Sequence, residues 1–344
     1  MDKKSRQTIG ITMGDPCGVG PEVTLKALAA LAKDPEPIDV VLIGSAGVFE
    51  KVARDVGISP EGLKNDNVSV RVLDAGDPFD TAGIDTRKPT PEAGRASVEC
   101  VFRGIEMALS GEIDALVTAP ISKEAMHMAG HPYPGHTEIL RERTGSETAA
   151  MMMVGNGLRV SFVTVHTPLR EVAWRINEEN IFSTISATAD GLEEFFAVPR
   201  SEQRIGVCAL NPHAGEGGLM GQEEGEIILP AVERAQREGI NCGGPLPADV
   251  IFHRAVEGEF DAVVSMYHDQ GTIPLKLLAF NSGVNLTLGL PIVRTSPTHG
   301  TAFDIAGRGV AGHGSMLEAI RLANKLAAAT KTSKQGEKTL TAPL

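Results

Sequence analysis

Short apolar runs and longer amphipathic segments alternate along most of this chain. The short runs, such as TIGITMG and DALVTAPIS, are typical of buried strands, and the segments between them carry apolar residues at helical spacing. The predicted strands cover residues 8–14, 38–45, 68–76, 114–122, 158–167, 204–213 and 260–269. The predicted helices cover residues 21–32, 46–57, 91–110, 178–196, 225–239 and 315–330. This alternation predicts an α/β protein with largely parallel sheets, whose sites lie at the carboxyl ends of the strands.

Three of the predicted strands end at a histidine in a loop punctuated by glycine or proline. These are His166 in VTVHTPL, His213 in LNPHAGEGG and His268 in MYHDQG. Imidazole is the commonest metal ligand among side chains, and three such ligands leave a coordination position open for a substrate. A single histidine is more often a surface or core residue. The repeated context nevertheless favours a site for one divalent metal, with Asn211 or Asp269 orienting a ring.

Two glycine-rich stretches and one GHTE segment are candidate ligand loops. The stretch GDPCGVGPEV, which starts at Gly14, matches no nucleotide-binding spacing, and a tight turn explains it equally well. In GHTE, His136 and Thr137 offer donors to an anion at a helix N-terminus, or Thr137 simply caps that helix. The second glycine-rich stretch, from Thr298 to Gly309, holds a nucleotide or closes a turn.

Cations for an anionic substrate stand out against a net charge of −12. Lys276 lies among apolar residues, in a stretch that is typical of strands and turns, where a lone surface lysine is unusual; Arg294 follows a strand-like run. They are the best candidates to bind a phosphate or a carboxylate, with a structural salt bridge as the alternative. Asp249 and Asp269 are candidate bases or holders of a metal-bound water, unless they orient a histidine.

The composition narrows the classes of partner. The chain has 344 residues, of which 42% are hydrophobic and 4% are aromatic, which is enough for two domains with aliphatic cores. No basic patch with interleaved aromatic residues is present, so nucleic acid is not an expected partner. No apolar run approaches the ~20 residues that span a membrane, and we expect no signal peptide. Four scattered cysteines without a CxxC pair predict reduced thiols in a cytoplasmic protein.

Taken in order, these segments closely resemble the 4-hydroxythreonine-4-phosphate dehydrogenase family of vitamin B6 biosynthesis. The resemblance runs from GITMGDPCGVGPEV through DALVTAPISK, GHTE, VTVHTPL, LNPHAGEGG, MYHDQG and VNLTLGLPIVRTS to HGTAFDIAGRG. It implies the two-domain fold of the isocitrate and isopropylmalate dehydrogenases, with largely parallel sheets and an interdomain cleft. Residues 1–125 plus 290–344 would form the cofactor-binding domain. Residues 126–289 would hold the metal and the substrate and form the contacts of a dimer.

The resemblance also implies roles for single residues. The metal ligands would be His166, His213 and His268, shared across a homodimer. The substrate contacts would be His136, Thr137, Lys276, Asn285 and Arg294. The contacts to NAD or NADP would include Gly14, Asp15, His299, Gly300, Asp304, Ile305, Ala306 and Gly307, without a Rossmann fingerprint. Lys276 or an aspartate such as Asp269 would handle the protons.

The implied reaction is oxidation of the 3-hydroxyl of 4-(phosphooxy)-L-threonine by NAD or NADP, followed by loss of CO2 to give 3-amino-2-oxopropyl phosphate. One divalent metal, Zn²⁺, Mg²⁺, Co²⁺ or Mn²⁺, would activate the hydroxyl and then stabilise the enolate. Related chains instead oxidise 4-phospho-D-threonate or 4-phospho-D-erythronate in sugar-acid catabolism, and another relative acts on a terephthalate-derived dihydrodiol. The alternative of a different class is a non-catalytic protein that binds a phosphorylated metabolite.

Overall fold

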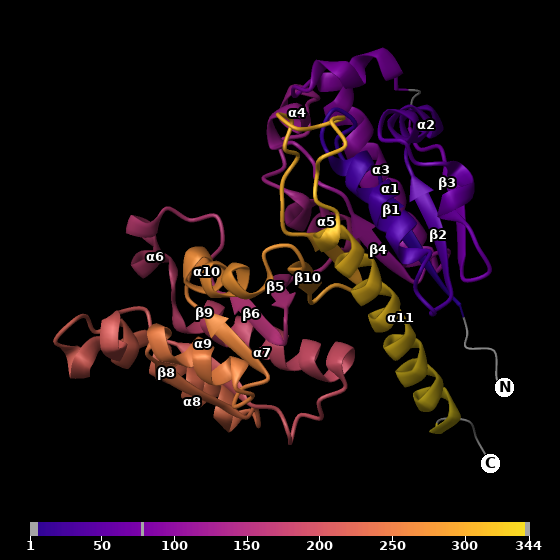
Figure 1. Ribbon diagram of the computed structural model, residues 1–344. Coiled ribbons are helices and arrows are strands. Elements are labelled where there is room, and N and C mark those ends of the chain that lie inside the picture. The colour runs from indigo at the N-terminus through magenta and orange to yellow at the C-terminus, as the bar shows by residue number, and fades with distance from the viewer. Residues whose placement is uncertain (1–5, 77–78, 341–344) are drawn as a thin grey trace. The chain divides into compact units, whose positions relative to one another are not determined.

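The computed structural model describes the backbone of residues 6–76 and 79–340, in two compact units (Figure 1). Unit 1 comprises Met1–Glu147 and Leu290–Leu344, and unit 2 is the segment Thr148–Gly289 between them. Residues 126–147 pack with unit 1. Both units combine helices with a sheet in which most neighbouring strands are parallel, so the predicted α/β class is confirmed.

The described strands of unit 1 form a parallel sheet in the order β3–β2–β1–β4–β11. They are β1 (Gln7–Thr12), β2 (Ile38–Ile43), β3 (Val68–Leu73), β4 (Ala115–Thr118) and β11 (Arg294–Pro297). The helices are α1 (Gly20–Leu31), α2 (Ala46–Asp55), α3 (Pro91–Ser110), α4 (Lys123–Met128), α5 (His136–Thr144) and α11 (Gly314–Leu340), with short turns η1 (Pro60–Leu63) and η2 (Thr81–Thr86). Because β1, β4 and β11 are parallel neighbours, the loops that follow them emerge at one edge of the sheet.

The helices of unit 1 begin and end at local sequence signals. α3 starts with a proline after Thr90, whose hydroxyl accepts a hydrogen bond from the backbone N–H of Ala93 at 3.1 Å. The same helix ends at Gly111, which has a left-handed backbone with φ of 77°. α11 packs against β11, α1 and β1. The last helix of the chain therefore belongs to the same core as the first strand.

The described strands of unit 2 form a mixed sheet in the order β10–β5–β6–β9–β7–β8. They are β5 (Ala150–Gly155), β6 (Leu158–Phe162), β7 (Ile205–Cys208), β8 (Cys242–Leu246), β9 (Ala262–Ser265) and β10 (Val284–Leu288). The helices are α6 (Leu169–Arg175), α7 (Glu178–Phe196), α8 (Leu229–Arg237), α9 (Ala248–Val256) and α10 (His268–Ala279), with η3 (Pro212–Gly218) and the single π-helical turn η4 (Glu224–Ile228). β5 is antiparallel to β10 and β6, whereas β6, β9, β7 and β8 are parallel.

The segment around Lys276 is a helix, α10, and not the strand- and turn-like stretch that its sequence indicates. Gly271 and Pro274 both disfavour a helix interior, which explains the wrong prediction. The glycine is needed for packing, because a Cβ there would lie 2.6 Å from a side-chain carbon of Val160 on β6. α10 thus lies close against the sheet despite a poor helical sequence.

The remaining expectations on composition concern thiols and membrane segments. All four cysteines are buried and free, and burial raises the pKa of Cys100 to about 12. Within residues 6–76 and 79–340, no helix combines the length and the hydropathy that a membrane span requires.

Candidate functional site

The two glycine-rich loops of unit 1 interlock at the carboxyl edge of its sheet. Gly14 has a φ of 72°, and a Cβ on it would lie 2.5 Å from the carbonyl oxygen of Pro120 after β4. The backbone N–H of Asp15 donates to that same carbonyl at 2.8 Å, and the N–H of Val19 donates to Thr301 O at 2.8 Å. Segments far apart in the sequence therefore form one cradle, which a single tight turn would not require.

Asp15 belongs to the first of these two loops and is completely buried. Its Oδ1 accepts a hydrogen bond from the backbone N–H of Cys17 at 2.9 Å. Its Oδ2 is enclosed and has no hydrogen-bond partner within the described part of the chain. Burial raises the pKa of Asp15 to about 6, although the bond from Cys17 opposes this rise. Asp15 thus combines an unsatisfied polar atom with a carboxyl group that titrates near neutrality.

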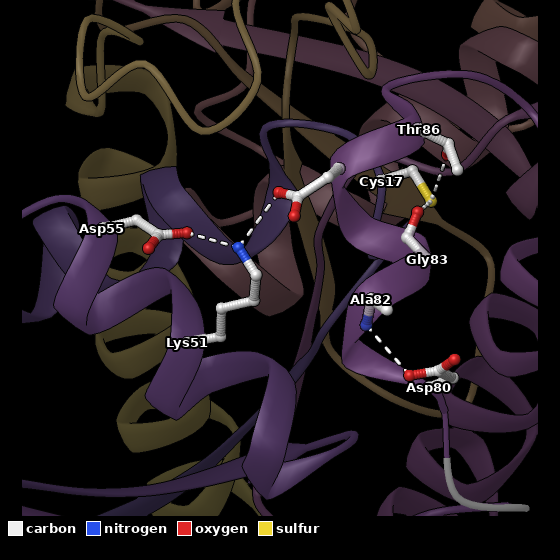
Figure 2. A network of polar contacts seen from close by, with 8 residues as sticks. Cys17, Lys51, Asp55, Asp80, Ala82, Gly83 and Thr86 are labelled. Carbon is white, nitrogen blue, oxygen red and sulfur yellow. Dashed lines mark hydrogen bonds and ion pairs between the residues drawn. The ribbon is translucent and has the colours of Figure 1, made fainter.

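Cys17 links the cradle to the short turn η2 (Figure 2). Its Sγ lies 3.4 Å from the carbonyl oxygen of Gly83, and the hydroxyl of Thr86 lies 3.5 Å from the same sulfur. Burial raises the pKa of this thiol to about 11, so it remains protonated at neutral pH. The cysteine therefore packs as a buried thiol between the cradle and η2.

Lys51 on α2 fixes the same turn from its other side, because its Nζ bridges two carboxylates (Figure 2). The distances are 2.8 Å to Asp55 and 3.0 Å to Asp85, and these hydrogen bonds raise the pKa of Lys51. The two carboxylates also line a small enclosed cavity, together with Ala306 and Gly307 of the second glycine-rich loop. The second glycine-rich loop therefore lies beside a small enclosed cavity.

A glutamate and a lysine one helical turn apart on α1 hold the far end of the second glycine-rich loop. The buried carboxylate of Glu22 accepts from the backbone N–H groups of Ala311 at 2.9 Å and Gly309 at 3.3 Å. Lys26 Nζ donates to the carbonyl oxygens of the same two residues at 2.7 and 2.9 Å. Sequence reasoning missed this pair, although Glu and Lys four residues apart on a helix were a visible signal.

Within the second loop, the predicted cofactor contacts occupy different environments. His299 Nδ1 lies 3.1 Å from the carbonyl oxygen of Gly300, and its Nε2 is enclosed without a partner among the described residues. Asp304 is exposed, and the N–H of Ile305 donates to Ala302 O at 3.1 Å in a local turn. The loop is therefore ordered by its own backbone and leaves one imidazole nitrogen unsatisfied.

A half-buried imidazole and a buried guanidinium lie close enough to interact electrostatically at the start of α5. Arg294 opens β11, is 2% exposed, and donates through Nε at 3.2 Å and Nη2 at 2.5 Å to the hydroxyl of Thr118. Burial lowers the pKa of Arg294 to about 9. Burial, and then the charge of Arg294, lower the pKa of His136 well below its ordinary value, so this ring is neutral. Its Nε2 is enclosed and unpartnered within the described residues.

The start of α5 adds backbone N–H donors beside His136 and Arg294. We call this place the His136–Arg294 corner. α5 begins at His136, its N-cap is Gly135, and no side chain caps it. The alternative in which Thr137 caps the helix is therefore wrong, since Thr137 is the second helical residue and leaves the first N–H groups free of a cap. Thr118, which orients Arg294, was missed by sequence reasoning because a threonine at a strand end has no distinctive signal.

In unit 2, the three predicted metal ligands follow adjacent parallel strands. His166 comes after β6, His268 is the first residue of α10 after β9, and His213 lies in η3 after β7. The rings of His166 and His268 are 6.1 Å apart between centroids. Among the described residues, no three or more His, Cys, Asp or Glu side chains are grouped to hold a metal ion. The structure thus brings the rings of His166 and His268 close together, and within the described residues His213 does not complete a group of three ligands with them.

Two of these histidines have a carboxylate against Nδ1. His268 Nδ1 lies 2.7 Å from Asp269 Oδ1, and His213 Nδ1 lies 3.2 Å from Glu216 Oε2. A carboxylate on Nδ1 fixes the tautomer in which Nε2 is free to bind a metal. Asp269 therefore orients a ring, whereas Asn211, the other predicted orienting residue, contacts Glu223 and not the ring.

The other predicted residues of unit 2 are dispersed over three elements. Lys276 is half-buried on α10, and Asp249 is exposed in the first turn of α9. Asn285 lies on β10 beside Met153 of β5, and its Oδ1 is enclosed without a partner in the described part of the chain. Asn285 is thus a polar acceptor in a mostly apolar strand.

Comparisons with known proteins identify relatives of this chain. A family model described as pyridoxal phosphate biosynthetic protein PdxA matches residues 36–323. The chain is 46% identical over 330 residues to the 4-hydroxythreonine-4-phosphate dehydrogenase of Desulforapulum autotrophicum, covering 93% of this chain and 95% of the relative. It is 43% identical over 331 residues to the D-threonate 4-phosphate dehydrogenase of Cupriavidus necator, covering 93% and 97%.

A solved structure extends the likeness to three dimensions. The crystal structure of 4-hydroxythreonine-4-phosphate dehydrogenase from Klebsiella pneumoniae is 39% identical, with a TM-score of 0.83 over 95% of this chain and 100% of that one. The likeness in sequence and in fold extends over most of the chain. This chain belongs to the PdxA family of pyridoxal phosphate biosynthetic proteins, a family of dehydrogenases.

Proposed function

We propose that the protein oxidises 4-(phosphooxy)-L-threonine at its 3-hydroxyl with NAD or NADP and then releases CO2, giving 3-amino-2-oxopropyl phosphate for pyridoxal phosphate biosynthesis. The observation that carries this proposal is the pair of His136 and Arg294 at the start of α5. A buried guanidinium, an imidazole nitrogen that is unpartnered within the described residues, and the N–H groups of a helix start that no side chain caps are the groups that receive a phosphate. The relatives named 4-hydroxythreonine-4-phosphate dehydrogenase point to the rest of the substrate.

The remaining substrate and proton roles fall on four residues. Thr137 adds a hydroxyl to the His136–Arg294 corner, and the enclosed Oδ1 of Asn285 accepts a hydrogen bond from the substrate. Lys276, half-buried on α10, transfers the protons of the reaction. Asp269 is less suited to that task, because its carboxylate is held by His268 Nδ1 at 2.7 Å. Asp249 is the second candidate base.

The donor set of His166, His213 and His268 fits a divalent metal, because the Nδ1–carboxylate contacts of the last two leave Nε2 to act as a ligand. When bound, Zn²⁺, Mg²⁺, Co²⁺ or Mn²⁺ would polarise the substrate oxygen as a Lewis acid. Since no cluster of three forms within the described part of one chain, we assign the complete ligand set to a homodimer.

The surface of unit 2 supports such a dimer. Ile273 and Leu277 on α10 and Phe280 at its C-cap follow one another at helical spacing and are 60%, 82% and 73% exposed. Trp174 on α6 is 83% exposed. Large apolar side chains at this exposure are typical of protein interfaces, and we propose that a second copy covers them.

The interlocked loops of unit 1 are the proposed NAD or NADP site. Their enclosed, unpartnered atoms, Asp15 Oδ2 and His299 Nε2, fit the hydrogen-bonding groups of a dinucleotide, which would accept the hydride. The other proposed contacts are Gly14, Gly300, Asp304, Ile305, Ala306 and Gly307. The four buried free thiols support a cytoplasmic location.

A substrate panel tests the reaction. Purified protein is assayed with NAD and with NADP, in the presence of Zn²⁺, Mg²⁺ or Mn²⁺, by the absorbance of the reduced cofactor. We expect turnover of 4-(phosphooxy)-L-threonine with release of CO2. No turnover of this compound beside rapid turnover of 4-phospho-D-threonate would refute the first assignment.

The second candidate function is oxidation of 4-phospho-D-threonate or 4-phospho-D-erythronate. The observation that favours it is the 43–44% identity to relatives named D-threonate 4-phosphate dehydrogenase, close to the 46% of the first group. Both substrates carry a phosphate for the His136–Arg294 corner, so the panel, and not the corner, decides between them.

A metal titration separates either enzyme from a non-catalytic binding protein. We expect His213→Ala to weaken binding of Zn²⁺ and to abolish turnover. His253→Ala changes an exposed histidine on α9 and serves as the matched control. Equal zinc binding and turnover in the two variants would remove His213 from the metal site.

A further inference from the structure

The loop that carries His213 contains a short left-handed turn. Six consecutive residues have positive φ: His213 (53°), Ala214 (54°), Gly215 (76°), Glu216 (45°), Gly217 (65°) and Gly218 (96°). Side chains of L-residues disfavour this backbone, and three of the six are not glycine. A strained turn at a candidate ligand persists only when its surroundings hold it in place.

A buried carboxylate holds the start of this turn. Glu224 is 6% exposed, and its Oε1 accepts from the backbone N–H groups of Leu210 at 2.9 Å and Asn211 at 2.7 Å. Its Oε2 accepts from the side-chain amide of Asn211 at 3.0 Å. These two residues immediately precede the turn, so one carboxylate fixes the point from which the turn departs.

The loop then closes around the same carboxylate. The N–H of Met220 donates to Gly215 O at 3.0 Å. A Cβ on Gly215 would lie 2.7 Å from Glu224 Oε2, and one on Gly221 would lie 2.4 Å from Asn211 Nδ2. A side chain at Gly215 would therefore displace the Glu224 carboxylate, and one at Gly221 would displace its partner Asn211.

The carboxylate itself is carried by a well-anchored element. Glu224 is the first residue of the π-helical turn η4, which packs against α7 and leads into α8. Ile228 of the same turn is completely buried. π-helical turns are frequent at functional sites. In this one Glu224 is buried, although none of the proposed substrate or metal contacts uses it.

We propose that Glu224 is a positioning residue, which holds the left-handed turn and thereby fixes where His213 presents its Nε2 to the metal. The proposal rests on the proposed metal role of His213. Glu216 acts on the ring itself, whereas Glu224 acts on the backbone that carries the ring. Removal of Glu224 should therefore impair metal binding more than it impairs the chemistry of the loaded enzyme.

The test compares Glu224→Ala and Glu224→Gln with Glu226→Ala, which removes an exposed glutamate two residues away. Zinc affinity is measured on the full-length protein by competition with a chelating dye. We expect Glu224→Ala to weaken zinc binding by ~10–100-fold, the range for residues that orient a metal ligand. Glu224→Gln, which keeps one acceptor oxygen, should lose less, and Glu226→Ala should match the wild type. Turnover of Glu224→Ala should recover at saturating zinc.

The outcomes separate this inference from the proposed function. If His213→Ala loses zinc while both Glu224 variants bind it as the wild type does, the inference is wrong and the metal role of His213 stands. If His213→Ala itself keeps full zinc affinity, the proposed function and the inference fall together. If Glu224→Ala does not fold, the graded zinc affinity of Glu224→Gln decides, and an unchanged value would overturn the proposal.

Discussion

Replacing Asp15 by asparagine should stabilise the protein at neutral pH while it weakens cofactor binding. The folded state raises the pKa of Asp15 from 3.8 to about 6, so it holds a proton that the unfolded chain releases. A pKa rise of this size corresponds to about 3 kcal/mol at ~1.36 kcal/mol per pH unit. Stability therefore falls as pH rises from about 4 to about 6. Asparagine has nearly the same shape and does not titrate, so the variant should avoid this loss.

The assay is urea unfolding followed by circular dichroism at several pH values. The free energies of unfolding of Asp15→Asn and the wild type should be nearly equal at pH 4, and the variant should gain up to about 3 kcal/mol at pH 7. Asp66→Asn, at an exposed position of unit 1, is the control and should show no such pH-dependent gain. A constant difference between Asp15→Asn and the wild type at all pH values would refute the reasoning. If Asp15 contacts the cofactor, the KM for NAD should rise in the same variant.

Four further changes test other parts of the structure. Arg294→Met should lower kcat/KM for the phosphorylated substrate by ~10–100-fold, because it removes a charge-assisted hydrogen bond. An unchanged kcat/KM in steady-state kinetics would contradict phosphate binding at the His136–Arg294 corner. Gly289→Ala should cost about 2 kcal/mol or more in urea unfolding, because φ is 74° and the Cβ would lie 2.4 Å from Thr148 O; equal stability would contradict the strain. Leu277→Glu should be monomeric in sedimentation experiments at concentrations where the wild type is dimeric. A variant that remains dimeric would exclude Leu277 from the interface. Treatment with EDTA should abolish turnover, and added Zn²⁺ or Mn²⁺ should restore it; full activity without metal would exclude a catalytic ion.

The alternation of apolar runs and helical segments predicted the α/β class and the strands that lead to the three histidines. It did not predict β5 or β8, since a run of methionines and the sequence CGGPL have no strong preference for a strand. It also missed α10, whose Gly271 and Pro274 hide a helix that tertiary packing stabilises. Local sequence preference is weaker than packing at each of these places.

The sequence predicted those site residues whose type alone suggests a chemical role. It did not predict residues whose role depends on their contacts in three dimensions. His136 and Arg294 stood out as an imidazole and a cation near turns, and the structure places them together. The supports for the site, Thr118, Glu22 and Glu224, are ordinary residues whose partners lie far along the chain. No local pattern encodes a contact between Thr118 and Arg294, which are 176 positions apart.

The division of the chain into units has a consequence for its synthesis on the ribosome. Unit 2 is one continuous stretch, so all of it is synthesised before the last described strand of unit 1. The sheet of unit 1 pairs β4 with β11, whose residues are separated by the whole of unit 2. Domains generally fold as units while the chain grows. Unit 2 can therefore fold first, and the N-terminal segment must wait with an open sheet edge at β4 until the end of the chain arrives.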